Sequence, residues 1–252
     1  MRLEFSMKNT LLITIISLLL FSCDSKIDNS FYIDLVYPAK EVVEKTYTAE
    51  NKYEEILQGK LISHIKYVYS HNEGSKMSEF SHFNATDGHL YKYLRRDNGN
   101  EHSFYLTSND TVFNDKTLIS EEGKLRIYII TGSSRTFTHT DTIWETLDDN
   151  ILTIQMGTRT RYILELKNGR TIRWVNYENN SIDHEICFKY NRKGFIIEEV
   201  KHSTITKDTK DIKVTTRSTY EYPEIDNKDN WIKKITYKDG EIESITTRDI
   251  IY

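Results

Sequence analysis

From about residue 60 onward, apolar and polar side chains alternate along the chain with a period of two. A strand places successive side chains on opposite faces of a sheet, so this alternation predicts half-buried strands. β-Branched and aromatic residues dominate these segments, as a pleated surface favours. The clearest examples are 125–129 (LRIYI), 152–156 (LTIQM) and 186–190 (ICFKY).

Turn signals divide the strands into hairpins. Asn-Gly and Asp-Gly pairs suit two-residue hairpin loops, because both central positions need a positive φ. The four such pairs are Asp87-Gly88, Asn98-Gly99, Asn168-Gly169 and Asp239-Gly240. The pattern predicts an all-β fold, an antiparallel meander of repeated hairpins. Only 42–60 has a helix-like composition, and there we expect a short helix over Ala49–Gln58.

A weak internal repeat accompanies the hairpins. Residues 190–200 (YNRKGFIIEEV) and 225–235 (IDNKDNWIKKI) share an apolar residue, a polar turn, an aromatic-Ile pair and a final apolar residue. Residues 80–90 and 164–174 are looser copies. The alternation leaves open a barrel, a sandwich or an extended repeat-built sheet, and the repeat favours the last. Whether 31–110 and 160–252 form separate units is also open.

The N-terminus reads as a processing signal. Leu11–Phe21 is an apolar run that follows Lys8, and it is shorter than the roughly 20 residues of a transmembrane helix. Leu20–Cys23 (LFSC) resembles the lipobox of bacterial lipoproteins. That resemblance implies a signal peptide over 1–22, lipid on the Cys23 thiol and a tether over 23–30. It places the protein in the cell envelope, at the outer membrane, with the membrane face left open.

The C-terminal segment resembles a known repeat family. Residues 219–252 contain YEY, DNW and TTRDIIY, which resemble the YD-like, RHS-related repeats of Bacteroides-group lipoproteins. Asp229 stands where that pattern has Gly. The resemblance implies a β domain over 31–252 and an envelope location, and it implies no reaction.

Composition excludes several classes of protein. The 252 residues include 34 Lys plus Arg and 38 Asp plus Glu, a net charge of −4, so the basic footprint of a nucleic-acid binder is lacking. Aromatic residues make up 12%, which disfavours disorder throughout. With Cys23 lipidated, Cys187 has no partner for an intramolecular disulfide.

No motif predicts catalysis, a metal or a cofactor. The eight His residues lack the close spacing that supplies several zinc ligands from one element. His184 and Cys187 are three apart on a predicted strand, so we expect them on opposite faces. Adjacent carboxylates such as Glu198-Glu199 are expected to be solvated. We therefore expect a protein that is not an enzyme, without cofactor or metal.

A few residues are candidates for binding or modification. Exposed Trp144, Trp174 or Trp231 would stack on sugars or dock a partner, although core packing is the more frequent use of such residues. Asp110-Thr111-Val112 and Asp141-Thr142-Ile143 resemble the Asp-Thr-apolar acceptor for O-linked glycans in Bacteroides-type envelope proteins. If Thr111 and Thr142 are used, both should lie on exposed turns.

These features favour a membrane-anchored envelope lipoprotein with a non-enzymatic structural or binding role. Its expected partners are the membrane, through the N-terminal lipid, and an envelope protein or glycan, with no nucleic acid. Two alternatives remain: a hydrolase of envelope polymers or glycans, and a lipid carrier with an apolar cavity inside the sheet.

Overall fold

The computed structural model describes residues 35, 39–52, 55–70, 76–86, 88–95, 101–106, 111–133, 138–207 and 210–252. Every regular element among them is a β-strand. The segments 1–22 and 23–30, including Cys23, and the Asn98-Gly99 turn lie outside the described residues. The strands are β1 (Glu41–Lys52), β2 (Glu55–Ser70), β3 (Lys76–Asn84), β4 (His89–Arg95), β5 (Glu101–Leu106), β6 (Thr111–Glu122), β7 (Leu125–Ser133), β8 (Thr138–Asp148), β9 (Ile151–Met156), β10 (Thr160–Lys167), β11 (Arg170–Glu178), β12 (Ser181–Tyr190), β13 (Ile196–Lys207), β14 (Lys210–Ile225), β15 (Trp231–Lys238) and β16 (Glu241–Ile251).

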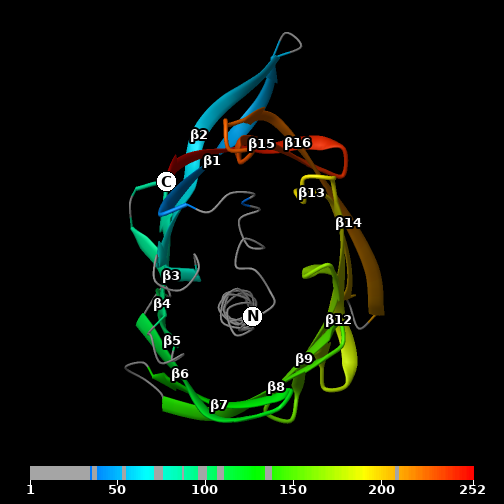
Figure 1. Ribbon diagram of the computed structural model, residues 1–252. Coiled ribbons are helices and arrows are strands. Elements are labelled where there is room, and N and C mark those ends of the chain that lie inside the picture. The colour runs from blue at the N-terminus through cyan, green and yellow to red at the C-terminus, as the bar shows by residue number, and fades with distance from the viewer. Residues whose placement is uncertain are drawn as a thin grey trace.

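Each strand pairs antiparallel with the strands before and after it in the chain, and β1 also pairs with β16. Glu41 lies opposite Ile251 and Thr48 lies opposite Ser244 at that seam. The sheet is thus a closed barrel, drawn as a ring in Figure 1. The predicted all-β antiparallel meander is confirmed. Its form is the barrel rather than the extended sheet that the repeat favoured, because β1 and β16 satisfy each other's backbone groups at the seam.

One hydrophobic cluster joins side chains from strands around the ring, so it lies on the inner face of the wall. Its most buried members include Val42, Ile143, Ile154 and Tyr162, each at most 1% exposed. In β7 the inner residues are Tyr128 and Ile130, while Ile129 is exposed on the outer face. The apolar Leu125, Ile127 and Ile129 set therefore faces outward, which the alternation by itself could not show.

Two of the predicted hairpin turns are confirmed. Asn168 and Gly169 have φ values of 53° and 75°, and Asp239 and Gly240 have φ values of 50° and 90°. Positive φ at both positions is the requirement that Asn-Gly and Asp-Gly meet. The turn at Gly88 is different, because the backbone N–H of Asn84 donates to the Gly88 carbonyl. It is therefore a five-residue turn.

The internal repeat has a structural basis in three such five-residue turns, which begin at Asn84, Asn191 and Asp226. In each, the first residue's backbone N–H donates to the carbonyl of the fifth. Its side-chain Oδ1 accepts hydrogen bonds from the backbone N–H groups of the third and fifth residues. Such side-chain contacts stabilise a turn locally. The copies at 80–90, 190–200 and 225–235 thus share a turn, whereas 164–174 contains a two-residue turn.

The expected helix over Ala49–Gln58 is wrong. Residues 41–52 and 55–70 form β1 and β2, and Ala49 lies opposite Gln58. The Thr48 hydroxyl accepts a hydrogen bond from the Lys60 backbone N–H at 2.8 Å. Cross-strand pairing thus overrides the weak helical preference of this segment.

Candidate functional site

Four side chains from adjacent strands form a row on the outer face of the barrel. Trp144 of β8 lies opposite Gln155 of β9, Gln155 opposite Arg161 of β10, and Arg161 opposite Tyr177 of β11. We call these four residues the outer row. Their neighbours along each strand are buried on the inner face, which is why the row faces outward. The buried neighbours are Ile143, Glu145, Ile154, Tyr162 and Asn176.

The outer row combines an exposed indole with polar planar groups. Trp144 is 38% exposed. The Arg161 guanidinium lies 4.5 Å from the centre of the Tyr177 ring, and its Nε is buried without a hydrogen-bond partner. Gln155 Nε2 donates to the Gly157 carbonyl at 2.8 Å. An apolar ring face beside polar groups is the composition of many binding surfaces, in which Trp, Tyr and Arg contribute most of the affinity.

The next row on the same face is small and aliphatic. Thr146 lies opposite Thr153, Thr153 opposite Ile163, and Ile163 opposite Val175. The outer row is thus a strip one residue wide across four strands, about 14 Å long at the usual strand spacing.

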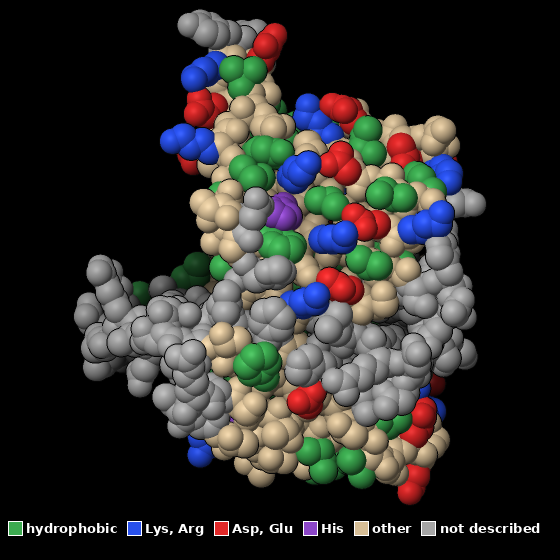
Figure 2. Space-filling model, turned by 90° about the vertical axis from the view of Figure 1, so that its left-hand side faces the viewer, with side chains coloured by type: hydrophobic (Ala, Val, Ile, Leu, Met, Phe, Trp, Pro, Cys, Tyr) green, Lys and Arg blue, Asp and Glu red, His purple; other side chains and the backbone are tan. Residues whose placement is uncertain are grey.

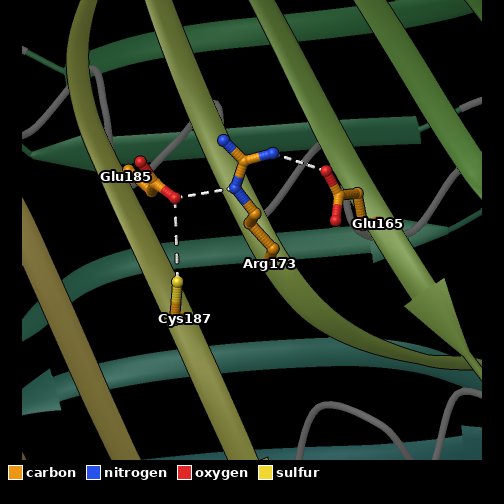
Figure 3. A network of polar contacts seen from close by, with 4 residues as sticks. All are labelled: Glu165, Arg173, Glu185 and Cys187. Carbon is orange, nitrogen blue, oxygen red and sulfur yellow. Dashed lines mark hydrogen bonds and ion pairs between the residues drawn. The ribbon is translucent and has the colours of Figure 1, made fainter.

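A polar network lies on β10, β11 and β12, on the same outer face (Figure 3). Arg173 Nη1 donates to Glu165 at 2.5 Å, and Arg173 Nε donates to Glu185 at 2.7 Å. The Cys187 thiol donates to the same Glu185 carboxylate. The three ionic side chains come from β10, β11 and β12, so the network links three strands on the outer face of the barrel.

Burial and the neighbouring carboxylate shift the pKa of the Cys187 thiol. Hydrogen bonding from Arg173 lowers the pKa of Glu185, and the two carboxylates raise the pKa of Arg173. Burial, followed by the nearby Glu185 charge, raises the pKa of the Cys187 thiol. A nucleophilic Cys needs a lowered pKa. This environment therefore stabilises the sheet and does not activate the sulfur.

The adjacent carboxylates Glu198 and Glu199 face opposite sides of the wall. Lys189 and Arg217 on the outer face hydrogen-bond to Glu198 and lower its pKa. Burial on the inner face raises the pKa of Glu199, to which the Tyr220 hydroxyl donates. The expectation that these acids are solvated is wrong for both: Glu198 is only 8% exposed and Glu199 is half-buried. Two carboxylates on opposite faces cannot act on one substrate.

Two ion pairs are buried among the inner residues. Lys116 Nζ lies 2.8 Å from Glu145 Oε1 and 3.9 Å from the centre of the Tyr128 ring. Arg248 lies 2.6 Å from Glu44 Oε1 and stacks on Trp231. One oxygen of Glu145 and one nitrogen of Arg248 have no hydrogen-bond partner. These pairs make the inner face polar at two separate places.

A β-bulge turns Asp183 toward His184. Asn176 lies opposite His184 while Tyr177 lies opposite Ile182, so Asp183 is the extra residue of β12. Asp183 Oδ2 lies 2.8 Å from His184 Nδ1 and accepts from Asn176 Nδ2 at 3.1 Å. The hydrogen bond from His184 lowers the pKa of Asp183. His184 faces inward and Cys187 outward, which confirms their expected placement on opposite faces.

Of the predicted binding residues, the structure exposes Trp144. Trp174 and Trp231 are 8% and 1% exposed, and they pack against Tyr162 and Tyr222 respectively. The sequence did not single out Gln155, Arg161 and Tyr177, because these residues lie on different strands and are brought together only by the strand register.

Neither predicted glycosylation site lies on an exposed turn. Thr111 is the first residue of β6, and Thr142 lies within β8 opposite Ile129. Both side chains are half-buried. The Thr142 backbone N–H donates to Asp141 Oδ1, and the Thr142 carbonyl accepts from Gly157. A strand position with its backbone engaged on both sides does not match the expected turn.

The described part of the chain has no group of three or more His, Cys, Asp or Glu placed to hold a metal ion. It also has no helix that is long and apolar enough to cross a membrane.

Comparisons with known proteins give only distant structural likeness. No family model matches the chain, and no curated protein matches it. A crystal structure of a porin-like protein from Bacteroides uniformis is similar at 8% identity, with a TM-score of 0.35. The match covers 85% of this chain and 98% of that one. At this TM-score, no conclusion about this chain follows from the likeness.

Proposed function

We propose that this chain is a non-enzymatic binding protein of the cell envelope, held to a membrane by lipid on Cys23, whose outer row binds a glycan. The observation that carries the proposal is the exposure of the Trp144 indole, which lies in the same row as the stacked Arg161 and Tyr177 on the outer face of the barrel. A sugar ring has an apolar face that fits an indole and hydroxyl groups that accept from guanidinium and amide donors.

The shape of the outer row favours a glycan over a protein. A stable protein interface buries about 800 Å² on each partner around a large apolar centre. The outer row is one residue wide, and small Thr153 and aliphatic Ile163 flank it. A chain of sugars laid across the strands would contact the whole strip, whereas a protein surface would need far more area.

The outer wall is suited to water. A lipid-facing barrel wall carries an apolar band roughly 25 Å tall. Here ion pairs occupy outer positions on many strands, among them Lys66–Glu41 and Lys45–Asp249. Figure 2 shows positive and negative side chains interspersed over one side of the wall. These charges support a barrel held beside the membrane by its tether, with its outer face free to meet a ligand.

Three observations weigh against the alternatives of a hydrolase and a lipid carrier. The paired acids Glu198 and Glu199 face opposite sides, and the pKa of Cys187 is raised. The buried Lys116–Glu145 pair interrupts the apolar inner face that a lipid chain would require. A binding role for the outer row requires neither a reactive group nor an inner cavity.

The glycan proposal is tested by affinity electrophoresis of the full chain carrying Cys23→Ala. The gels contain a soluble β-glucan, an α-glucan, a polyuronate or peptidoglycan fragments. We expect one polymer to retard the protein, and Trp144→Ala to weaken that binding about tenfold or more, as loss of a binding hot spot does. Ile212→Ala, which truncates a similarly exposed residue of β14, is the matched control. No retardation by any polymer, or equal retardation of Trp144→Ala, would refute glycan binding at this row.

The anchor is tested separately by membrane fractionation, and the membrane face by protease accessibility on intact cells. We expect the wild-type chain to remain with the membrane fraction and the Cys23→Ala chain to be released from it. A Cys23→Ala chain that stays membrane-bound and normally processed would show that lipid on Cys23 is not the anchor. Digestion without lysis would place the protein at the cell surface, and protection until lysis would place it in the periplasm.

A further inference from the structure

Arg161 is the one charged residue of the outer row, and no carboxylate of the described chain forms an ion pair with it. Its guanidinium stacks on the Tyr177 ring instead, 4.5 Å from the ring centre, and its Nε is buried without a hydrogen-bond partner. A guanidinium is always charged and has five N–H donors, whose strongest acceptors are themselves charged. This partly exposed group is therefore suited to an acceptor from outside the chain.

Two other arginines of the outer face do hold carboxylates. Arg173 pairs with two of them, as Figure 3 shows, and Arg217 pairs with Glu198. In both cases the acid comes from a neighbouring strand. The strands on either side of Arg161 instead place Gln155 and Tyr177 opposite it. The acid that satisfies the other two arginines is thus missing here among the described residues.

The rows that border the outer row contain no acidic residue. The small and aliphatic row described above lies on one side. On the other side, the Gly157 N–H donates to the Thr142 carbonyl and the Asn179 N–H donates to the Arg159 carbonyl, so these four residues follow the outer row. The three rows together have two positive charges, Arg159 and Arg161, and no negative charge. This region therefore differs in sign from the whole chain, whose net charge is −4.

A sugar that carries a carboxylate supplies what these rows lack. Its ring has an apolar face that stacks on the Trp144 indole, as a neutral sugar does. Its carboxylate in addition accepts two parallel hydrogen bonds from the planar fork of a guanidinium, and such charge-assisted bonds are roughly twice as strong as neutral ones. The stack on Tyr177 holds the Arg161 fork in one plane, so less side-chain freedom is lost when the carboxylate binds.

We propose that the outer row selects an acidic glycan, one whose sugars carry carboxylate groups, and that Arg161 sets this selectivity. The inference rests on the proposed function and names the substrate class within it. Trp144 contributes stacking that neutral and acidic sugars share, whereas Arg161 contributes a contact that only an acidic sugar completes. Arg159, in the turn between β9 and β10, adds positive potential beside the row.

The test compares each acidic sugar chain with its own methyl ester, which keeps the sugar backbone and removes the charge. Oligomers of galacturonate, glucuronate and mannuronate, and their esters, are titrated into the full chain carrying Cys23→Ala by calorimetry at pH 7. We expect at least one acid to bind about tenfold or more tightly than its ester, as loss of a charge-assisted hydrogen bond implies. Dextran sulfate, which carries a different oxyanion, should bind more weakly than that acid.

Three variants separate charge from stacking. Arg161→Gln should lower the affinity for the acid about tenfold and bring the ratio of acid to ester affinity close to one. Trp144→Ala should weaken the binding of acid and ester by the same factor, so the ratio stays unchanged. Arg217→Gln is the matched control, because it removes the same charge from the outer face at an arginine that already pairs with Glu198. It should leave both affinities unchanged.

The outcomes distinguish this inference from the proposed function. An ester bound as tightly as its acid, or an acid preference that Arg161→Gln retains, would overturn the acidic selectivity and leave glycan binding at the outer row standing. Tighter binding of dextran sulfate than of every uronate would overturn the assignment of a carboxylate. Failure of all acidic and neutral glycans to bind would overturn the proposed function itself. Thermal unfolding checks that Arg161→Gln is folded, and Arg161→Lys, which keeps the charge and loses the planar fork, should retain only part of the acid preference.

Discussion

The buried pair Lys116–Glu145 allows a sharp test of how the barrel interior is stabilised. The two side chains are 0% and 3% exposed, and their charged atoms lie 2.8 Å apart. The second oxygen of Glu145 has no hydrogen-bond partner. A buried ion pair with an unsatisfied oxygen contributes little net stability, yet removal of one partner takes away the opposite charge that offsets the burial of the other.

We therefore expect strong non-additivity. Lys116→Met or Glu145→Leu alone should lower the free energy of unfolding by about 3–5 kcal/mol. The double variant, with apolar side chains of similar volume, should be equal to the wild type or more stable by about 1–4 kcal/mol. The exposed pair Lys45–Asp249, 42% and 72% exposed, is the matched control, and its loss should cost under about 1 kcal/mol.

The assay is urea unfolding of the full chain carrying Cys23→Ala, followed by tryptophan fluorescence, with all four members of each cycle compared at equal m-value. Non-additivity of several kcal/mol at Lys116–Glu145 and almost none at Lys45–Asp249 is the expected result. If Lys116→Met alone were as stable as the wild type, the charges would be solvated in solution, and the argument from burial would be wrong.

Three further measurements test local features. Gly194→Ala should lower the free energy of unfolding in urea by about 1 kcal/mol or more, because Gly194 has φ +90° and an added Cβ would meet the Arg170 guanidinium. Asp229→Gly should be neutral or stabilising, because Asp229 has a φ of 63°, which Gly adopts readily. Burial raises the folded-state pKa of Glu199, so the stability that Glu199 contributes falls as pH rises through that pKa. In thermal unfolding, Glu199→Gln should therefore be more stable than the wild type at pH 7 and not at pH 4. The raised pKa of Cys187 should make its thiol react with a disulfide reagent more slowly in the native chain than in urea; an equal rate would contradict its protonated, half-buried state.

The sequence was sufficient to predict features that depend on a few adjacent residues. Alternation in 152–156 and 186–190 predicts strands because side-chain direction follows from the backbone of each strand alone. Asn168-Gly169 and Asp239-Gly240 predict their turns because positive φ is a local requirement. The repeat of 190–200 and 225–235 is visible because each copy closes its own turn.

The tertiary structure decided everything that depends on register between distant strands. The pairing of Glu41 with Ile251 closes the barrel, and that closure selects Tyr128 over Ile129 as the inner residue of β7. The pairing of β1 with β2 makes residues 49–52 and 55–58 two strands, where the local sequence predicts a helix. The outer row exists because Trp144 and Tyr177, 33 positions apart, are aligned by three successive strand pairings. Such pairings depend on side-chain packing and backbone hydrogen bonds summed over the whole sheet, which no short segment of sequence contains.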